Sequence, residues 1–182
     1  MRSTLELVRE HAAIEELLAR FERVLDGARR DGQADAEALG RLLDFFEQEV
    51  DDHHQRKEER LLLHCGERAP RGDLQRVLHE HDEERRLLAV FRDNLCGARF
   101  GEPNCIAALS RYGASYLDLQ RAHSSWEERT LFPLAERVLG PGDDRVLLDG
   151  LCRMDGLHGG SLCAAARALE EWLDRRSPPV LA

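Results

Sequence analysis

Four long segments of the chain carry apolar residues at intervals of three and four positions, which is the period of an amphipathic α-helix. In the first segment these residues are Leu7, Ile14, Leu18, Phe21 and Leu25. The segments are rich in alanine, leucine, glutamate and arginine, which favour helices, and aromatic residues make up only 5% of the chain. The sequence therefore predicts an all-α protein.

Capping residues indicate where the helices should begin. Ser3 and Glu6 form a capping-box pattern at the start of the first segment. Asp35 and Asp73 suit the N-cap position of two further helices, and Pro103 suits the first turn of a fourth. Glycines and prolines follow the segments and should end them. The expected helices are 3–32, 35–66, 73–97 and 103–140, followed by a last helix over about 161–175.

Short connections join the first four segments, so neighbouring helices should run antiparallel in an up-down-up-down four-helix bundle. We expect this bundle to occupy residues 1–141, and residues 142–182 to form a helical extension that packs on it. Four glycines are expected to interrupt the extension before its last helix: Gly150, Gly156, Gly159 and Gly160.

Charge and composition exclude several classes of function. The formal net charge is −9, and arginines alternate with glutamates, so the chain lacks the clustered positive charge that nucleic acids require. No apolar stretch approaches the roughly 20 residues of a membrane span, and glutamates interrupt the N-terminal region where a signal peptide would be apolar. The five cysteines include no C-x-x-C pair, which favours reduced thiols. We expect a cytoplasmic protein that binds neither nucleic acid nor membrane.

One histidine falls on the apolar face of each of the four helices, and in the second and fourth helices a glutamate follows it four residues later near the same face. The six inward polar residues are His11, His54, Glu58, His81, His123 and Glu127. Burying an unpaired carboxylate is costly, so each glutamate should have a positive partner. That partner could be a metal ion, a hydrogen-bonded histidine or an arginine.

The depths of these residues favour the metal ion. In an antiparallel bundle the histidines of the first three helices lie at one end, within one or two turns of each other. The fourth helix fits if it overhangs or bends at Pro133, where a proline should kink it. Convergence of six such side chains at one level predicts a metal site, and its nitrogen and oxygen ligands suit iron, manganese or zinc.

The same residues lie in motifs that resemble the hemerythrin-like family, which is named for its His-His-Glu cation-binding signature. The matching motifs, within about residues 4–140, are EH at Glu10–His11, HHQRKEE at His53–Glu59, LHEHDEERRLL at Leu78–Leu88 and HSSWEERTLFPLAERVL at His123–Leu139. The resemblance implies a non-haem di-iron centre inside the bundle. Its terminal ligands would be His11, His54, His81 and His123, with Glu58 and Glu127 bridging the two iron ions.

One position departs from the oxygen-carrying members of that family. Arg85 stands four residues after His81, where those proteins have a fifth histidine. The site should therefore have an open position or a substitute ligand such as Glu84 or Glu15, which argues against reversible oxygen carriage. Arg85 itself could pair with Glu84, Glu127 or an incoming anion.

Residues near these six are expected to have supporting or unrelated roles. Glu59 and Glu128 should lie beside the site or at the surface, and His53 should neighbour the site without being a ligand. His79 should be exposed. His64 and His158 are expected to be structural or exposed, and Tyr116 should pack or hydrogen-bond near the site.

Three functions are consistent with this pattern. The favoured one is a binding or sensing protein whose di-iron centre meets a small diatomic ligand (oxygen or nitric oxide) or peroxide, or which handles iron, without catalytic residues. The second is a di-iron oxidase or peroxidase. The E-x-x-H motif of ferritin-like di-iron enzymes is missing, because Gln120 and Asp51 stand three residues before His123 and His54. The third is a metal-free helical interaction module whose inward polar groups satisfy each other. The sequence indicates no particular protein partner.

Overall fold

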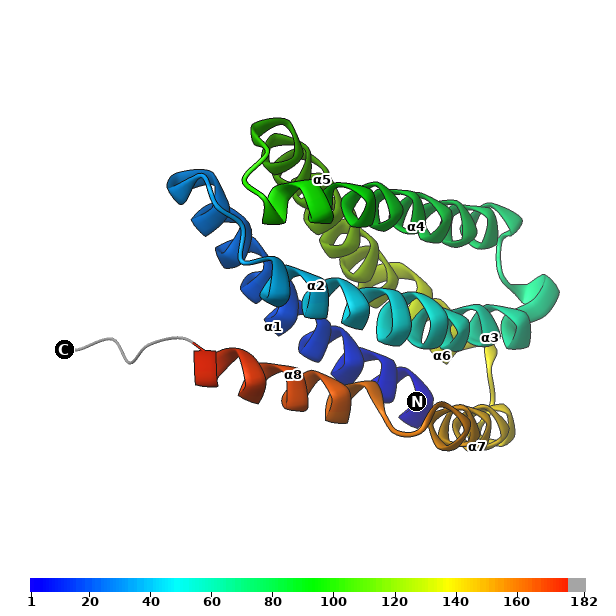
Figure 1. Cartoon of the computed structure of the whole chain (residues 1–182). Helices are drawn as coiled ribbons and strands as arrows, with labels where there is room; N and C mark the ends of the chain where they lie inside the picture. The colour runs from blue at the N-terminus through cyan, green and yellow to red at the C-terminus, as the bar shows by residue number, and fades with distance from the viewer. Residues whose placement is uncertain (177–182) are drawn as a thin grey trace.

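The computed structural model describes residues 1–176, and all regular elements in that range are helical (Figure 1). The four segments of the bundle are α1 (Arg2–Asp31), α2–η1–α3 (Ala36–Phe45, Phe46–His54 and Gln55–Cys65), α4 (Arg71–Arg99) and α5–η3–α6 (Pro103–Trp126, Glu127–Leu131 and Phe132–Val138). A short 3₁₀ turn, η2 (Gly66–Arg68), precedes α4, and α7 (Pro141–His158) and α8 (Leu162–Arg176) follow α6. The predicted all-α, up-down-up-down bundle is confirmed. Within the described range, no helix is long and apolar enough to cross a membrane.

Several helix boundaries follow from the residues predicted to set them. The Asp35 carboxylate accepts a hydrogen bond from the Ala38 amide at 3.1 Å and caps α2. Gly32 ends α1 with φ of 65°, a left-handed conformation that glycine adopts without a steric penalty. Pro103 is the first residue of α5, where its missing N–H group has no helical partner to lose.

Two of the predicted caps are wrong. The helix α1 begins at Arg2, so Ser3 lies inside it, and the Asp144 carboxylate of α7 accepts hydrogen bonds from the Arg2 and Ser3 amides at 3.0 Å each. A carboxylate from a distant part of the chain thus caps the N-terminus of α1 in place of the expected local capping box. Asp73 lies within the first turn of α4, which begins at Arg71.

Two of the predicted interruptions of the extension are also wrong. Gly150 and Gly156 lie within α7, which continues to His158 and ends at Gly159 with φ of 100°. At Gly150 the side chain of Arg60 packs closely on α7, because a Cβ atom there would lie 2.8 Å from the Nε atom of Arg60 unless that side chain moved. A glycine inside a helix costs only about 1 kcal/mol relative to alanine, so this close approach of α7 to α3 is compatible with an unbroken helix.

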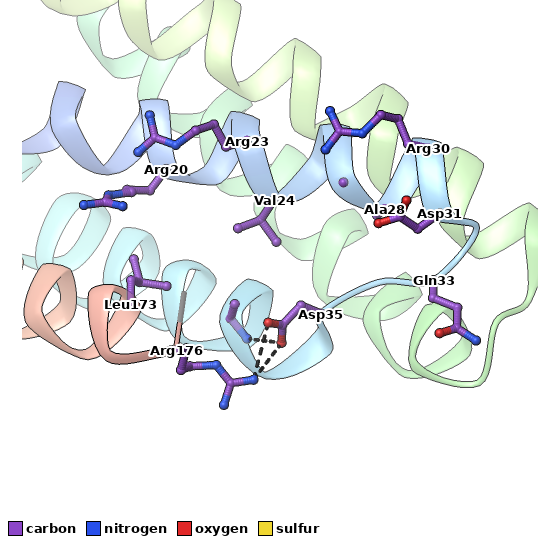
Figure 2. Close-up of a pocket in the computed structure, with 12 residues that line it drawn as sticks. Arg20, Arg23, Val24, Ala28, Arg30, Asp31, Gln33, Asp35, Leu173 and Arg176 are labelled. Atoms are coloured by element: carbon purple, nitrogen blue, oxygen red, sulfur yellow. Dashed lines mark hydrogen bonds and ion pairs between the residues drawn. The ribbon is translucent and has the colours of Figure 1, made fainter. Parts of the chain in front are cut away.

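The last two helices lie against the bundle at different places. Figure 1 shows α7 beside the beginning of α1 and α8 running back along α1 and α2, and both helices contact α1. Arg176 of α8 donates to the Asp35 carboxylate at 3.2 Å, as Figure 2 shows. A cleft of 530 Å³ lies between α1, α2 and α8, and arginines line much of it.

The buried apolar residues form two clusters, one on each side of a polar layer. One cluster contains the rings of Phe21, Phe46, Phe91 and Tyr116 together with aliphatic residues such as Ile14 and Val50. The other contains Leu7, Leu61, Val77, Leu131 and Leu147. Along each of the four bundle segments, the predicted histidine lies between residues of the two clusters. The clusters therefore enclose the histidines from both sides.

Candidate metal site

The Glu58 carboxylate lies at the centre of the polar layer and approaches all four predicted histidines. Its Oε1 atom is 3.0 Å from the Nε2 atom of His11 and 2.7 Å from that of His54. Its Oε2 atom is 3.3 Å from the Nε2 atom of His81 and 3.7 Å from that of His123. The two oxygens of one carboxylate thus face two different pairs of imidazoles.

The sixth predicted residue, Glu127, reaches across the same two sides. Its Oε2 atom is 3.4 Å from the Nε2 atom of His11 and 3.6 Å from that of His123. Donor atoms lie within 4.8 Å of one another in two groups, which are His11, His54 and Glu58, and Glu58, His81, His123 and Glu127. The structure therefore brings all six predicted residues together, in two groups that share one carboxylate. Such an arrangement suits two neighbouring cations.

Both glutamates are positioned next to π-helical turns. The π-helix η1 ends at His54, one turn before Glu58, and η3 begins at Glu127. At the end of η3 the Phe132 amide donates to the carbonyl of Glu127, five residues earlier, so the turn is wider than in an α-helix. The next residue, Pro133, has no N–H group and would clash with a carbonyl four residues earlier in a regular helix. The bend expected at this proline therefore takes the form of a π-helical turn that carries Glu127.

Each of the four imidazoles turns its Nε2 atom toward the centre and its Nδ1 atom toward a carboxylate from another segment. The Nδ1 pairs are His11 with Glu128 at 3.0 Å, His54 with Glu10 at 2.7 Å, His81 with Glu59 at 3.2 Å and His123 with Glu80 at 2.8 Å. These contacts form a circuit around the bundle, in which every segment gives a carboxylate to the histidine of the next. A carboxylate on Nδ1 holds the proton there and leaves the Nε2 lone pair available to a metal.

Only some of the four carboxylates that contact the Nδ1 atoms could be predicted from the sequence. Glu59 and Glu128 lie beside the site, as predicted. Glu10 and Glu80 were missed, although a signal exists in the sequence, because each directly precedes a predicted histidine. A residue next to an inward ligand points along the edge of its helix, where it meets the adjacent helix.

Several buried nitrogen and oxygen atoms of the layer lie close to one another but have no partner in hydrogen-bonding geometry among the described residues. They are Nε2 of His54, Oε2 of Glu58 and both carboxylate oxygens of Glu127, and both glutamate side chains are fully buried. A buried polar atom without a partner costs roughly 1–3 kcal/mol, and an unpaired charge costs more. Cations between these atoms would satisfy them, so the residues fit a metal centre.

In the absence of a cation, protons must balance the charges of the layer. Burial opposes a charge on His11, but Glu127 and Glu58 raise its pKa to about 10. Burial likewise opposes a charge on His81, but Glu58 and Glu59 raise its pKa to about 9. Burial and the charge of Glu58 raise the pKa of Glu127 to about 7. Cations entering the layer would therefore have to displace protons at neutral pH.

The partners of Arg85 differ from those expected from the sequence. Arg85 does not pair with Glu84 or Glu127. Its partly exposed guanidinium donates instead to Asp51 at 2.7 Å and to Asp82 at 2.6 Å. The expected pairings of Arg85 with Glu84 and with Glu127 are thus wrong, and the third possibility, an incoming anion, stays a prediction.

The two substitute ligands considered from the sequence have different environments. Glu15 is exposed and pairs with Arg121 at 3.1 Å, so it does not reach the layer. Glu84 is buried, and one of its oxygens accepts a hydrogen bond from Gln55 at 2.6 Å while the other has no partner among the described residues. Burial raises the pKa of Glu84 to about 7. Of the two, Glu84 is thus the buried one, and it belongs to neither of the two groups of neighbouring donor atoms.

The other histidines lie outside the two groups. His53 is buried, with its Nε2 atom 2.7 Å from Asp155 of α7 and its ring stacked on His158 at a centroid distance of 4.2 Å. His79 is exposed, as predicted. Tyr116 packs on Phe46, with its hydroxyl 3.5 Å from Gln120.

A small hollow lies at the surface beside His11 of the layer. It has a volume of 340 Å³ and lies between α1 and α5, where His11, Glu128, Arg121 and Ser124 are among its lining residues. The larger cleft of Figure 2 is lined by residues of α1, α2 and α8 and by the loop before α2. Of the two, only the hollow beside His11 is lined by one of the six central residues.

A four-helix bundle with buried histidines and glutamates facing one centre defines a class of cation-binding proteins. The family model of the hemerythrin HHE cation binding domain matches residues 4–135, and the chain belongs to this family. No curated protein and no solved structure gives a significant match to the chain. The matched range includes the six central residues and ends before α7 begins at Pro141.

Proposed function

We propose that the chain is a di-iron protein that binds or senses a small molecule such as oxygen, nitric oxide or peroxide, or that handles iron. Four histidines would be terminal ligands, and Glu58 and Glu127 would bridge the two metals. The observation that carries the proposal is the position of Glu58, whose two oxygens face different pairs of imidazoles. A carboxylate in that position is suited to join two cations.

The supporting side chains agree with this function. Each imidazole has a carboxylate on Nδ1, which orients the ring and raises its basicity as a ligand. The apolar clusters on both sides keep bulk water from the layer. The hollow beside His11 has room for a diatomic molecule or peroxide, and its polar lining includes Ser124 and Arg121.

The donor set suits iron, manganese or zinc, and iron is favoured by the resemblance to hemerythrins. An iron centre would supply electrons to, or accept them from, the small molecule that it meets. The chain's own residues would bind and orient the metals, exclude water and hold a proton on each Nδ1 atom. The metal-free alternative is disfavoured, because one carboxylate oxygen of Glu58 and both of Glu127 have no hydrogen bond among the described residues.

Metal analysis of the full chain tests the proposal. Protein purified from iron-replete cells is expected to hold close to two metals per chain, and its electronic spectrum should change on anaerobic reduction and again in air. Glu58→Gln should lose most of the metal, while Glu15→Gln, a change at an exposed glutamate, should retain it. Equal metal contents in the two variants, or a wild type without bound metal, would contradict the proposal. Steady-state turnover of peroxide would favour the enzyme alternative.

A further inference from the structure

A buried lysine connects the candidate metal site with α7. Lys57 is fully buried, and its ammonium donates hydrogen bonds to the carboxylates of Glu10 and Asp155. A buried ammonium is strongly destabilising unless carboxylates compensate it. Glu10 comes from α1 and Asp155 from α7, so the lysine joins three helices at one point.

The same Glu10 carboxylate holds one of the proposed ligands. Its other oxygen lies 2.7 Å from the Nδ1 atom of His54, and Glu10 is fully buried as well. A continuous series of contacts therefore runs from Asp155 through Lys57 and Glu10 to His54. Asp155 also contacts His53, the residue before that ligand, at 2.7 Å.

The charges in this series affect how strongly the Glu10 carboxylate holds the Nδ1 proton of His54. One ammonium is shared between two carboxylates, so Asp155 takes part of the attraction that Lys57 would otherwise direct at Glu10 alone. Without the charge of Asp155, Glu10 would be drawn toward Lys57 and would hold the Nδ1 proton of His54 less strongly.

We propose that Asp155 is a positioning residue of the metal centre, acting on His54 through Lys57 and Glu10. This inference rests on the proposed function. It assigns a role at the centre to α7, which lies beyond the range matched by the family model. Asp155 would touch no metal itself, and would set the orientation and basicity of one ligand.

Titration of the metal-free full chain with Co²⁺ tests the proposal, since the visible absorption of the bound ion reports its ligands. Removing a direct partner of a ligand commonly lowers metal affinity about 10- to 100-fold, which is the loss expected for Glu10→Gln. Asp155→Asn acts at one remove and should lower the affinity about 3- to 10-fold and shift the visible band. Asp155→Glu keeps the charge on a longer side chain and should recover most of the affinity.

Two changes on the same helix serve as controls. Asp144→Asn weakens the other attachment of α7, at the beginning of α1, and should lower the melting temperature without moving the cobalt spectrum. Asp149→Asn alters an exposed residue of α7 and should change neither.

The possible outcomes separate the two proposals. A wild type that binds no Co²⁺ would contradict the metal function itself and, with it, this inference. A wild type that binds Co²⁺, together with an Asp155→Asn variant whose spectrum and affinity match those of Asp144→Asn, would overturn only the role of Asp155. If Asp155→Asn does not fold, Asp155→Ser, which also removes the charge, decides the matter, because wild-type affinity and an unshifted spectrum in that variant would overturn the role equally.

Discussion

The aromatic cluster around Phe21, here called the aromatic half of the core, and the adjacent polar layer are equally buried but differ in whether their atoms have the partners they require. In the aromatic half the ring centroid of Phe21 lies 5.0 Å from that of Phe91 and 5.5 Å from that of Phe46, and these apolar groups require no hydrogen-bond partner. In the adjacent layer, Glu58 and Glu127 are buried to the same degree, yet several of their oxygens have no hydrogen-bond partner among the described residues. Burial alone therefore does not show that the polar atoms of a core have their partners.

This difference separates the energetics of the two regions. The aromatic half should stabilise the fold by packing, whatever the state of the metal site. The polar layer should stabilise the fold most when cations balance its carboxylates and bind its imidazoles, and less when protons alone balance its charges. Changes in one region should therefore affect properties that changes in the other leave alone.

The largest effect is expected from Phe21→Ala in the aromatic half. Loss of a buried phenylalanine side chain typically costs about 3–5 kcal/mol of stability, because it leaves a cavity. Chemical denaturation should show this loss to a similar extent in metal-free and metal-loaded protein, with the number of metals per chain unchanged. Leu5→Ala, at an exposed leucine, is the control. Loss of metal from a folded Phe21→Ala variant would show that metal binding in the polar layer depends on the packing of the aromatic half.

A second effect concerns the dependence of stability on pH. In the metal-free protein the pKa of His11 is raised to about 10 and that of His81 to about 9, against an ordinary value of 6.5. Groups with a raised pKa stabilise the fold fully below pH 6.5 and lose that contribution as the pH rises through the raised values.

Thermal unfolding in the presence of a chelator should therefore shift downward between pH 6.5 and 9. One pKa unit corresponds to about 1.4 kcal/mol, so a decrease of at least about 3–5 °C is expected. The metal-loaded protein should decline less, because its imidazoles are neutral ligands. Parallel curves for the two forms would argue against protons as the substitute for cations.

A third effect should be confined to metal binding. Glu128 contacts the Nδ1 atom of His11 but is partly exposed, so Glu128→Gln should leave the metal-free fold nearly as stable as before. Its affinity for metal should fall about 10- to 100-fold, as for other partners of metal-bound histidines. Competition with a coloured chelator measures this loss, and Glu15→Gln provides the matched control. An affinity equal to that of the control would remove Glu128 from the site.

The smallest effect is expected at Arg85, near the boundary between the two regions. Arg85 forms partly exposed ion pairs, and such pairs contribute about 0–1 kcal/mol. Arg85→His should therefore change stability by no more than about 1 kcal/mol and leave the metal content unchanged. Arg92→His is a close match, because Arg92 is equally exposed and also pairs with two acids. A clear change in metal content at position 85 alone would show that this position reaches the layer.

The six central residues could be predicted because the helical period fixes which face each one occupies. The period does not show which side chain of another helix a residue will meet. The contact of Glu10 with His54 was therefore missed, as was the burial of Lys57, which depends on where α7 packs. The Ser3 cap failed for the same reason, since Asp144 reaches the beginning of α1 from a segment far along the chain.

Thermal unfolding of the wild type, with and without metal, tests most directly whether cations complete the polar layer. The metal-free protein and the protein loaded anaerobically with ferrous iron should be compared in the same buffer. A ligand present at a thousand times its dissociation constant stabilises the folded state by about 4 kcal/mol, which predicts a rise of about 8–16 °C in a chain of this size. The Glu58→Gln variant should lose most of that rise. Coincident melts of metal-free and iron-loaded wild type would contradict the account.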